Sequence, residues 1–203
     1  MKHKRIFEIT FCAIMAAMAI ALNSVASLQV TQAIKITVYA LPLLVVGVLF
    51  GPLMGLTTGL VAGVVLQLTS PYGISLSSPF WALAPSCWGG VSGLMYKLFK
   101  KLGNWPAIII AIVLASISAN LVNTLAMIMD SLLVKDSWYT FSAIMLDWPG
   151  RLLTMVVTLI PYIAITGIVC ESLRKIFMLD ENSDTNLKNV DSEGKEEKEE
   201  IEE

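Results

Sequence analysis

The chain has 203 residues, of which 56% are hydrophobic and only 15% are charged, and its mean hydropathy is +0.72. This composition excludes an ordinary soluble domain and indicates a membrane protein. The net charge of −2 hides two unlike parts, because 11 acids and 3 bases lie from Asp180 onward, which leaves 11 bases and 5 acids in residues 1–179. The three cysteines lie in apolar runs, and their odd number argues against a disulfide framework.

Six segments of the body are long and apolar enough, or nearly so, to cross a bilayer, which takes roughly 20 residues. They are 6–28, 34–50, 52–69, 79–99, 105–133 and 149–177. The first follows a basic start, as in a signal peptide, but five more apolar segments favour a retained span. The second is the shortest and contains Pro42, which predicts a kinked or tilted helix. We therefore predict an all-α membrane domain over residues 1–179, a bundle of six transmembrane helices.

The C-terminal residues 180–203 have a different character. They contain almost no large apolar side chains, so burial cannot offset the entropy lost on ordering them. We predict a disordered, acidic cytoplasmic tail. A solvated extension is favoured over a segment that docks on a partner.

Basic residues predict the orientation. With the N-terminus inside, eight bases of the body lie on the cytoplasmic side: Lys2, Lys4, Arg5, Lys97, Lys100, Lys101, Arg174 and Lys175. Lys35, Lys135 and Arg151 lie outside. This distribution satisfies the positive-inside rule, so both termini are expected in the cytoplasm and the connections 29–33, 70–78 and 134–148 face outward.

Small residues at four-residue spacing predict close helix packing. Gly51, Gly55, Gly59 and Gly63 form one stripe, and we expect it to pack inside the bundle, because small residues let helices approach in hydrocarbon. Ala13, Ala17 and Ala21 form a second such face on the first span. Packing inside the bundle and docking of another membrane subunit are equally good interpretations of this alanine face.

The residues of common catalytic sites are missing. His3 is the only histidine and lies in the basic start, so no Ser–His or Cys–His nucleophile pair is available. The five acids of the body show no metal-type clustering, no phosphate-binding loop motif occurs, and no acid lies in mid-span for an ion relay. We therefore expect a binding protein rather than an enzyme, without a cofactor, a bound metal or a nucleic-acid partner.

Polar and aromatic residues gather at the outer ends of the spans and in the outer connections. The candidate ligand-binding residues are Lys35, Tyr39, Gln67, Tyr72, Ser78, Phe80, Trp81, Asn120, Asn123, Trp138, Trp148 and Arg151. Aromatic walls with a few placed polar groups suit a small-molecule pocket. An aromatic belt at the membrane interface, with snorkelling cations, is the structural alternative.

Arg151 follows Pro149, a residue suited to the first position of a helix. If the helix begins there, Arg151 and the free N–H groups of the first turn hold a carboxylate or a phosphate together. Alternatively, Asp147 caps this helix and pairs with Arg151. Asn120 and Asn123 lie three apart inside a span, so their amides need partners on neighbouring helices or on a ligand.

Residues 6–177 resemble the substrate-binding S components of energy-coupling-factor (ECF) vitamin transporters. The resemblance rests on six spans in about 180 residues and on the spacing of Ala13, Ala17 and Ala21. It also rests on the stretches LPLLVVGVLFGPLMGLTTGLVAG and SPYGISLSSPFWALAPSCWGGVSGLMYK, and on Asn120 and Asn123.

The resemblance implies a multi-pass protein of the cell membrane that captures a water-soluble vitamin from outside. A transmembrane coupling subunit and two ATPase subunits then supply the energy, and the alanine face contacts the coupling subunit. The spacing is closest to folate-type members. However, the usual proline-glycine-phenylalanine stretch reads Pro79-Phe80-Trp81 here, and Gln67 replaces an acid that often closes the third span. Another vitamin or precursor therefore remains an alternative substrate. A membrane scaffold that binds no small molecule remains an alternative function.

Overall fold

The computed structural model describes the backbone of residues 2–29, 35–70, 73–134 and 139–202, and the side chains of residues 5–27, 36–70, 73–134 and 139–176. Contacts between residues divide the chain into two compact units, Met1–Gly167 and Ile168–Glu203. The last helix, α6 (Phe141–Glu202), runs from the first unit into the second.

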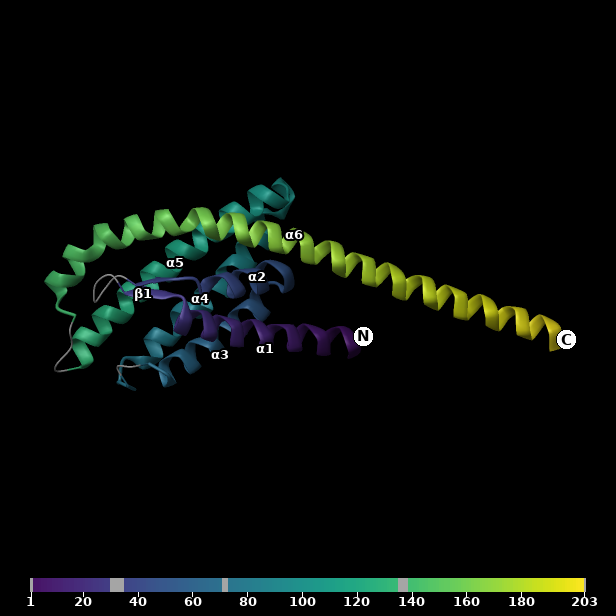
Figure 1. Ribbon diagram of the computed structural model, residues 1–203, viewed down its shortest axis with the longest axis horizontal. Coiled ribbons are helices and arrows are strands. Elements are labelled where there is room, and N and C mark those ends of the chain that lie inside the picture. The colour runs from purple at the N-terminus through teal and green to yellow at the C-terminus, as the bar shows by residue number, and fades with distance from the viewer. Residues whose placement is uncertain (1, 30–34, 71–72, 135–138, 203) are drawn as a thin grey trace. The chain divides into compact units, whose positions relative to one another are not determined.

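The first unit consists almost entirely of helices (Figure 1). In chain order its elements are α1 (Lys2–Val25), β1 (Ser27–Gln29), β2 (Lys35–Thr37), α2 (Ala40–Phe50), α3 (Pro52–Leu68), α4 (Ser78–Phe99), the 3-10 helix η1 (Lys100–Leu102), α5 (Asn104–Leu133) and the first part of α6. Apart from the two strands, this architecture confirms the predicted helical fold class.

The two short strands form a hairpin that the all-α prediction missed. β1 pairs antiparallel with β2, and Leu28 lies opposite Ile36. The second strand reads Lys-Ile-Thr, and its β-branched residues favour an extended backbone. Because the hairpin takes up this stretch, α2 begins at Ala40 instead of residue 34. Pro42 then lies in the first turn of α2, where no N–H is needed for the helix, so the reason for expecting a kink there does not hold.

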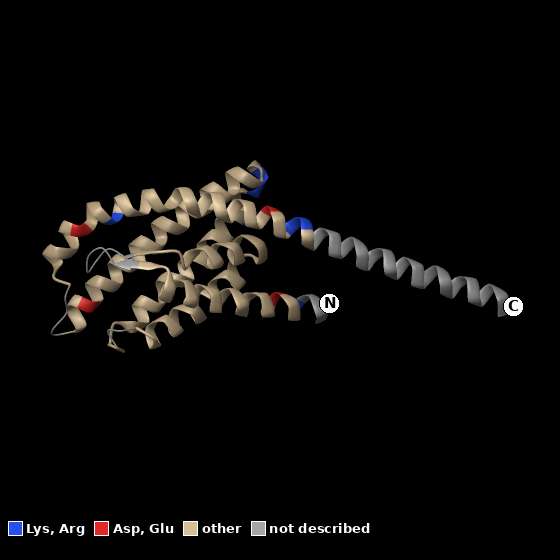
Figure 2. Cartoon of the chain, viewed as in Figure 1, with Lys and Arg blue, Asp and Glu red and all other residues tan. Residues whose placement is uncertain are grey.

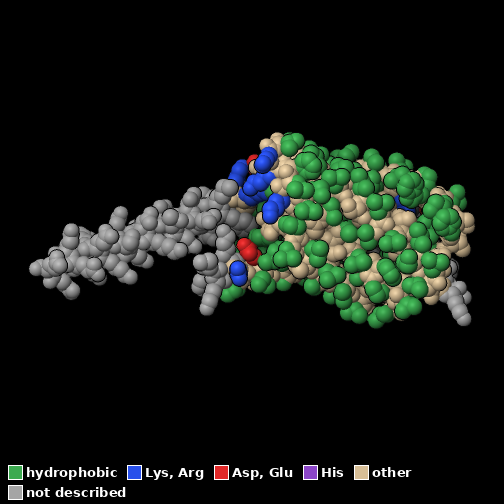
Figure 3. Space-filling model, turned by 180° about the vertical axis from the view of Figure 1, so that it is seen from behind, with side chains coloured by type: hydrophobic (Ala, Val, Ile, Leu, Met, Phe, Trp, Pro, Cys, Tyr) green, Lys and Arg blue, Asp and Glu red, His purple; other side chains and the backbone are tan. Residues whose placement is uncertain are grey.

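Within the described part of the chain, three helical segments are long and apolar enough to cross a membrane: Arg5–Val25, Asn104–Leu133 and Phe141–Ile176. The helices α2 and α3 are apolar but shorter, and α4 is not among the three. Among the described side chains, charged residues are sparse along the helices (Figure 2), and hydrophobic side chains cover much of the face seen in Figure 3. Exposed apolar side chains on several helices, such as Leu53, Leu121 and Ile160, suit a hydrocarbon solvent. Six spans and a cytoplasmic location of both termini stay predictions.

The predicted glycine packing is confirmed at the contact between α3 and α4. A Cβ atom on Gly55 would lie 2.3 Å from the carbonyl oxygen of Gly89, and one on Gly59 would lie 2.4 Å from that of Pro85. Backbone therefore touches backbone, which only hydrogen-sized side chains allow. Gly51 has a different role, because it lies between α2 and α3 with φ of +90°.

The helices α1 and α2 also pack against α3. Ala16 and Ala19 of α1 pack with Leu43 of α2 and Ala62 of α3, and Tyr39 and Trp88 border this cluster. The small residues on this side of α1 thus serve packing inside the first unit.

In the second unit, the backbone of α6 stays helical to Glu202. This segment contains the acidic tail for which the sequence predicts disorder. Its many Glu and Lys residues are good helix formers. Its lack of apolar side chains was the reason to expect disorder. Disorder of residues 180–203 stays a prediction.

Candidate functional site

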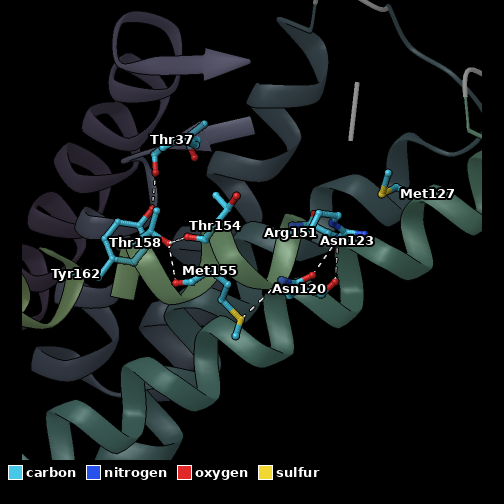
Figure 4. A pocket seen from close by; sticks show the side chains of 10 residues that line it. Thr37, Asn120, Asn123, Met127, Arg151, Thr154, Met155, Thr158 and Tyr162 are labelled. Carbon is cyan, nitrogen blue, oxygen red and sulfur yellow. Dashed lines mark hydrogen bonds between the residues drawn. The ribbon is translucent and has the colours of Figure 1, made fainter. Parts of the chain in front are cut away.

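A cavity of about 170 Å³ lies within the first unit, between side chains of α5, α6 and β2 (Figure 4). Its lining residues are Ile36, Thr37, Asn120, Asn123, Met127, Arg151, Thr154, Met155, Thr158 and Tyr162. Each helix contributes one face. On α5, Asn120, Asn123 and Met127 are spaced by three and four residues, which places them on the same side of a helix.

The face of α6 is polar along most of its length. Arg151, Thr154, Thr158 and Tyr162 follow one another at spacings of three, four and four residues, so they too share one side of the helix. The stretch between them is otherwise apolar. This polar stripe therefore faces the cavity while the rest of the helix presents hydrocarbon-compatible side chains.

Arg151 is the only cation among the residues that line the cavity, and it is 7% exposed. Its Nη2 donates to the side-chain Oδ1 of Asn120 at 3.0 Å and to the Asn120 carbonyl at 3.3 Å. Its Nη1 is buried and has no hydrogen-bond partner. None of the described carboxylates forms a salt bridge with it. The buried guanidinium is thus hydrogen-bonded by neutral groups alone, and the nearby Asp147 attracts its charge without forming a salt bridge.

The hydroxyl groups further along α6 already donate hydrogen bonds to backbone carbonyls. Thr154 donates to the carbonyl of Gly150 at 2.9 Å, and Thr158 donates to that of Thr154 at 2.9 Å. Tyr162 donates to the Thr37 carbonyl of β2, and its ring meets Trp88 edge-on with centroids 5.5 Å apart. Toward a ligand, these hydroxyls offer oxygen lone pairs and not donors.

The two amides on α5 are less engaged. Asn120 Nδ2 donates only to the sulfur of Met155, at 3.7 Å, which is a weak interaction. Asn123 makes no hydrogen bond within the described part of the chain. Its amide is therefore free to donate to, or accept from, a molecule in the cavity.

Of the predicted ligand-binding residues, Asn120, Asn123 and Arg151 line this cavity together. The others that are described lie elsewhere. Tyr39 packs against the core cluster of α1, α2 and α3, and Gln67 is half-buried near the end of α3. Trp148 is 43% exposed.

The remaining predicted residues lie in or near the first turn of α4, in β2, or outside the described residues. Ser78 is buried at the start of α4 and accepts a hydrogen bond from the N–H of Ser75. Phe80 is half-buried. The ring centroids of Trp81 and Tyr139 are 5.8 Å apart. The backbone of Lys35 belongs to β2, but its side chain is not among those described. Tyr72 and Trp138 lie outside the described residues.

The predicted anion site at a helix N-terminus is wrong. The helix α6 begins at Phe141, and Thr140 accepts a hydrogen bond from the N–H of Ala143, as a capping residue does. Pro149 lies inside the helix, so Arg151 is in its third turn and has no free backbone N–H groups beside it. Asp147 neither caps this helix nor forms a salt bridge with Arg151. A proline inside a membrane helix is tolerated where other groups satisfy the freed backbone.

Sequence reasoning missed seven lining residues: Ile36, Thr37, Met127, Thr154, Met155, Thr158 and Tyr162. Those on α6 had a detectable signal, because Thr154, Thr158 and Tyr162 continue the helical spacing from Arg151. The two on β2 had none, since their position depends on the hairpin.

A second polar cluster ties the connection before α4 to the end of α5. Ser77 is completely buried and donates to Oδ1 of Asp130, and its Oγ lies 2.7 Å from that of Ser75. These groups satisfy one another, so the cluster has a structural role. No group of three or more metal-ligating side chains occurs among the described residues.

The three alanines of the predicted partner interface, Ala13, Ala17 and Ala21, are exposed on α1. Within the first unit it is Ala16 and Ala19, on another side of α1, that pack in the core. Ile14 and Met18 are exposed beside them. This face of α1 is apolar, flat and uncovered in the first unit.

Comparisons with known proteins agree on one kind of protein. The model of the family described as "ECF-type riboflavin transporter, S component" matches residues 4–170. The chain is also similar to a solved structure described as "Crystal structure of FolT bound with folic acid", with a TM-score of 0.61 and 23% sequence identity. That similarity covers 81% of this chain and 94% of the other, and at this identity it shows the fold alone. No curated protein sequence matches the chain.

Proposed function

Because this chain belongs to the family of ECF-type riboflavin transporter S components, we propose that it captures a water-soluble vitamin at the outer face of the cell membrane. The bound vitamin then passes through a transmembrane coupling subunit, driven by two separate ATPase subunits. The observation that carries this proposal is the cavity between α5, α6 and β2, with the buried Arg151 and the free amide of Asn123 on its wall.

The size of the cavity limits how a vitamin is held. Pockets for small organic molecules usually measure about 300–1,000 Å³, whereas this one measures about 170 Å³. We propose that it encloses one end of the vitamin. Asn120, Asn123 and Arg151 provide the directional hydrogen bonds, and Ile36, Met127 and Met155 provide apolar walls.

The exposed alanine face of α1 is the proposed contact with the coupling subunit. Small side chains at four-residue spacing let a partner helix approach closely. Ala13, Ala17 and Ala21 are all exposed, while another side of α1, with Ala16 and Ala19, already packs in the core. This division of α1 leaves one face for folding and one for assembly.

Two substrates are supported by different observations. Riboflavin is the vitamin named by the family to which the chain belongs. Folic acid is the ligand named for the structure with a similar fold, and the spacing of segment 42–81 is most similar to that of folate-type members. We propose folic acid and riboflavin as the first two vitamins to test.

The test is a binding titration without an energy source. The full-length protein in lipid nanodiscs is titrated with each vitamin while tryptophan fluorescence is recorded. Trp88 contacts Tyr162, a residue of the cavity wall, so ligand entry is expected to change its emission. We expect tight, saturable binding of one vitamin at a ratio of one to one.

Two variants locate the binding. Asn123→Ala removes a free amide from the cavity and is expected to weaken binding, while Trp148→Ala alters an exposed ring away from it and is expected to have no effect. A protein that binds neither vitamin, while remaining monodisperse and helical, would contradict the proposed function. It would then favour a membrane scaffold, which needs only the alanine face.

A further inference from the structure

No described carboxylate forms a salt bridge with Arg151. On its own helix, Asp147 lies one turn before it and attracts its charge only through space. On the facing helix, the carboxylate of Asp130 accepts a hydrogen bond from the buried Ser77. An ionised group in a low-dielectric interior is strongly unfavourable unless an opposite charge or several hydrogen bonds compensate it. Arg151 has hydrogen bonds only through Nη2, and these go to neutral oxygens of Asn120.

Hydrogen-bond donors gather at the same end of the cavity. The guanidinium of Arg151 has an unpartnered Nη1, Asn123 has a free amide, and Asn120 Nδ2 has only a sulfur acceptor. In Figure 4 these three side chains lie together, with Met127 beyond them. An acceptor with several lone pairs and a negative charge satisfies all three groups at once, which neither water nor a neutral carbonyl does.

The opposite end of the cavity has another chemistry. In Figure 4, Thr158, Tyr162 and Thr37 lie together, away from Arg151. The hydroxyl protons of Thr158 and Tyr162 are already donated to backbone carbonyls. Eleven residues separate Arg151 from Tyr162, which corresponds to about 16 Å along a helix. The site is therefore polarised, with donors and a positive charge at one end and apolar groups and acceptors at the other.

From this polarity we infer that the ligand presents an anionic group, a carboxylate or a phosphate, to Arg151, and an uncharged part to the Tyr162 end. The inference rests on the proposed function, because it specifies the chemistry of the vitamin that the same cavity holds. The inference predicts that anionic ligands bind more tightly than neutral ones. Riboflavin is neutral and lacks such a group, whereas its 5′-phosphate ester and folic acid both carry one.

The experiment compares matched ligand pairs that differ only in this group. Full-length protein in phosphatidylcholine nanodiscs, a bilayer without net charge, is titrated calorimetrically with four probes. They are folic acid, its diamide, riboflavin 5′-phosphate and riboflavin. We expect the anionic member of at least one pair to bind about tenfold to a hundredfold more tightly than its neutral partner, as for a hydrogen-bonded charge. The pair that shows the difference tells a carboxylate from a phosphate.

Arg151→Gln tests the residue itself. This variant keeps hydrogen-bond donors but removes the charge, and we expect the preference for the anionic member to disappear. Arg5→Gln is the matched control, since it makes the same chemical change at an exposed position on α1 and is expected to keep the preference. If Arg151→Gln does not fold, Arg151→Lys is used. It keeps the charge but not the guanidinium geometry, and the preference is expected to persist at lower affinity.

The outcomes separate the two proposals. Equal affinities of the wild-type protein for neutral and anionic members would overturn the inference and leave the proposed function standing. A preference unchanged in Arg151→Gln would overturn the assignment of Arg151. Failure of all four probes to bind would overturn the proposed function for these vitamins, and the inference with it.

Discussion

Buried polar side chains have two kinds of role in this protein. Some satisfy one another and tie the segment before α4 to the end of α5, as Ser77 and Asp130 do. Others, such as Arg151 and Asn123, keep donors unused beside a cavity. The distinction matters because an unused buried donor destabilises the isolated protein. Such a group is expected to persist only where a ligand compensates it.

Ser77→Ala tests the structural role of the hydrogen bond between Ser77 and Asp130. The change removes a completely buried hydroxyl that donates to Asp130, and it leaves that carboxylate with one partner fewer. We expect a loss of about 1–3 kcal/mol of stability, seen as a lower melting temperature in detergent. Ser142→Ala, at an exposed position, serves as the control and is expected to have little effect. A melting temperature equal to that of the wild type would show that the bond contributes nothing.

Tyr162→Phe tests the link between α6 and the hairpin. The ring contact with Trp88 remains, but the hydrogen bond to the Thr37 carbonyl is lost. We expect ligand affinity to fall about fivefold, which corresponds to one hydrogen bond of about 1 kcal/mol, because β2 forms part of the cavity wall. Calorimetric titration measures this change. Unaltered affinity together with a lower melting temperature would assign Tyr162 a role in stability alone.

At the scale of elements, the smallest residues make a close contact between α3 and α4. The backbones of α3 and α4 touch at Gly55 and Gly89, and Pro85 and Ser86 face Gly59. Hydrophobic attraction between helices is weak in a bilayer, so van der Waals contact of this kind is what holds such helices together. The cavity lies beside this core, between elements that contact each other through longer side chains.

Gly55→Ala is therefore expected to destabilise the bundle. The added methyl would lie 2.3 Å from the carbonyl oxygen of Gly89, so the two helices must separate. Overpacking of this kind typically costs about 1–3 kcal/mol, and thermal unfolding in detergent measures it. Gly90→Ala is the matched control, because the nearest atom there is a side-chain carbon of Leu56 at 3.1 Å. Equal losses in both variants would contradict a special role for the backbone contact.

At the scale of the whole molecule, the proposed function is a ligand receptor that depends on other subunits for energy. The resemblance to ECF S components, which the sequence motifs suggest, is confirmed by the family match over residues 4–170. The proposed division of labour places ligand binding between α5, α6 and β2, and subunit contact on α1. Since different helices carry the two functions, each is expected to be removable without the other.

Ala17→Leu tests this separation. A leucine at the centre of the alanine face would hold a partner helix away from α1. We expect the coupling and ATPase subunits to copurify poorly and vitamin uptake by cells to fall at least tenfold, while the affinity of the isolated subunit for its vitamin is unchanged. Val157→Leu, which enlarges an exposed side chain on α6, is the control. Normal uptake by Ala17→Leu would move the subunit interface elsewhere.

Much of the architecture was predictable from local patterns. Runs of apolar residues indicated the helices, four-residue glycine spacing indicated a close contact, and missing catalytic groups pointed to binding. The start of α6 was not predictable in this way, because Pro149 is compatible with both the first turn and the interior of a membrane helix. The hairpin was also missed, since its strands are only three residues long.

The sequence by itself therefore determined the class of protein and three residues that line the cavity, Asn120, Asn123 and Arg151. Composition and helical periodicity are local properties, and a single segment displays them. Only the tertiary structure decided that Thr37, Thr158 and Tyr162 share a wall with these residues, and that the Nη1 of Arg151 has no partner. The first fact depends on β2 meeting α6, more than a hundred residues later in the chain, and the second depends on how α5 meets α6. No pattern within a single segment encodes how it meets another.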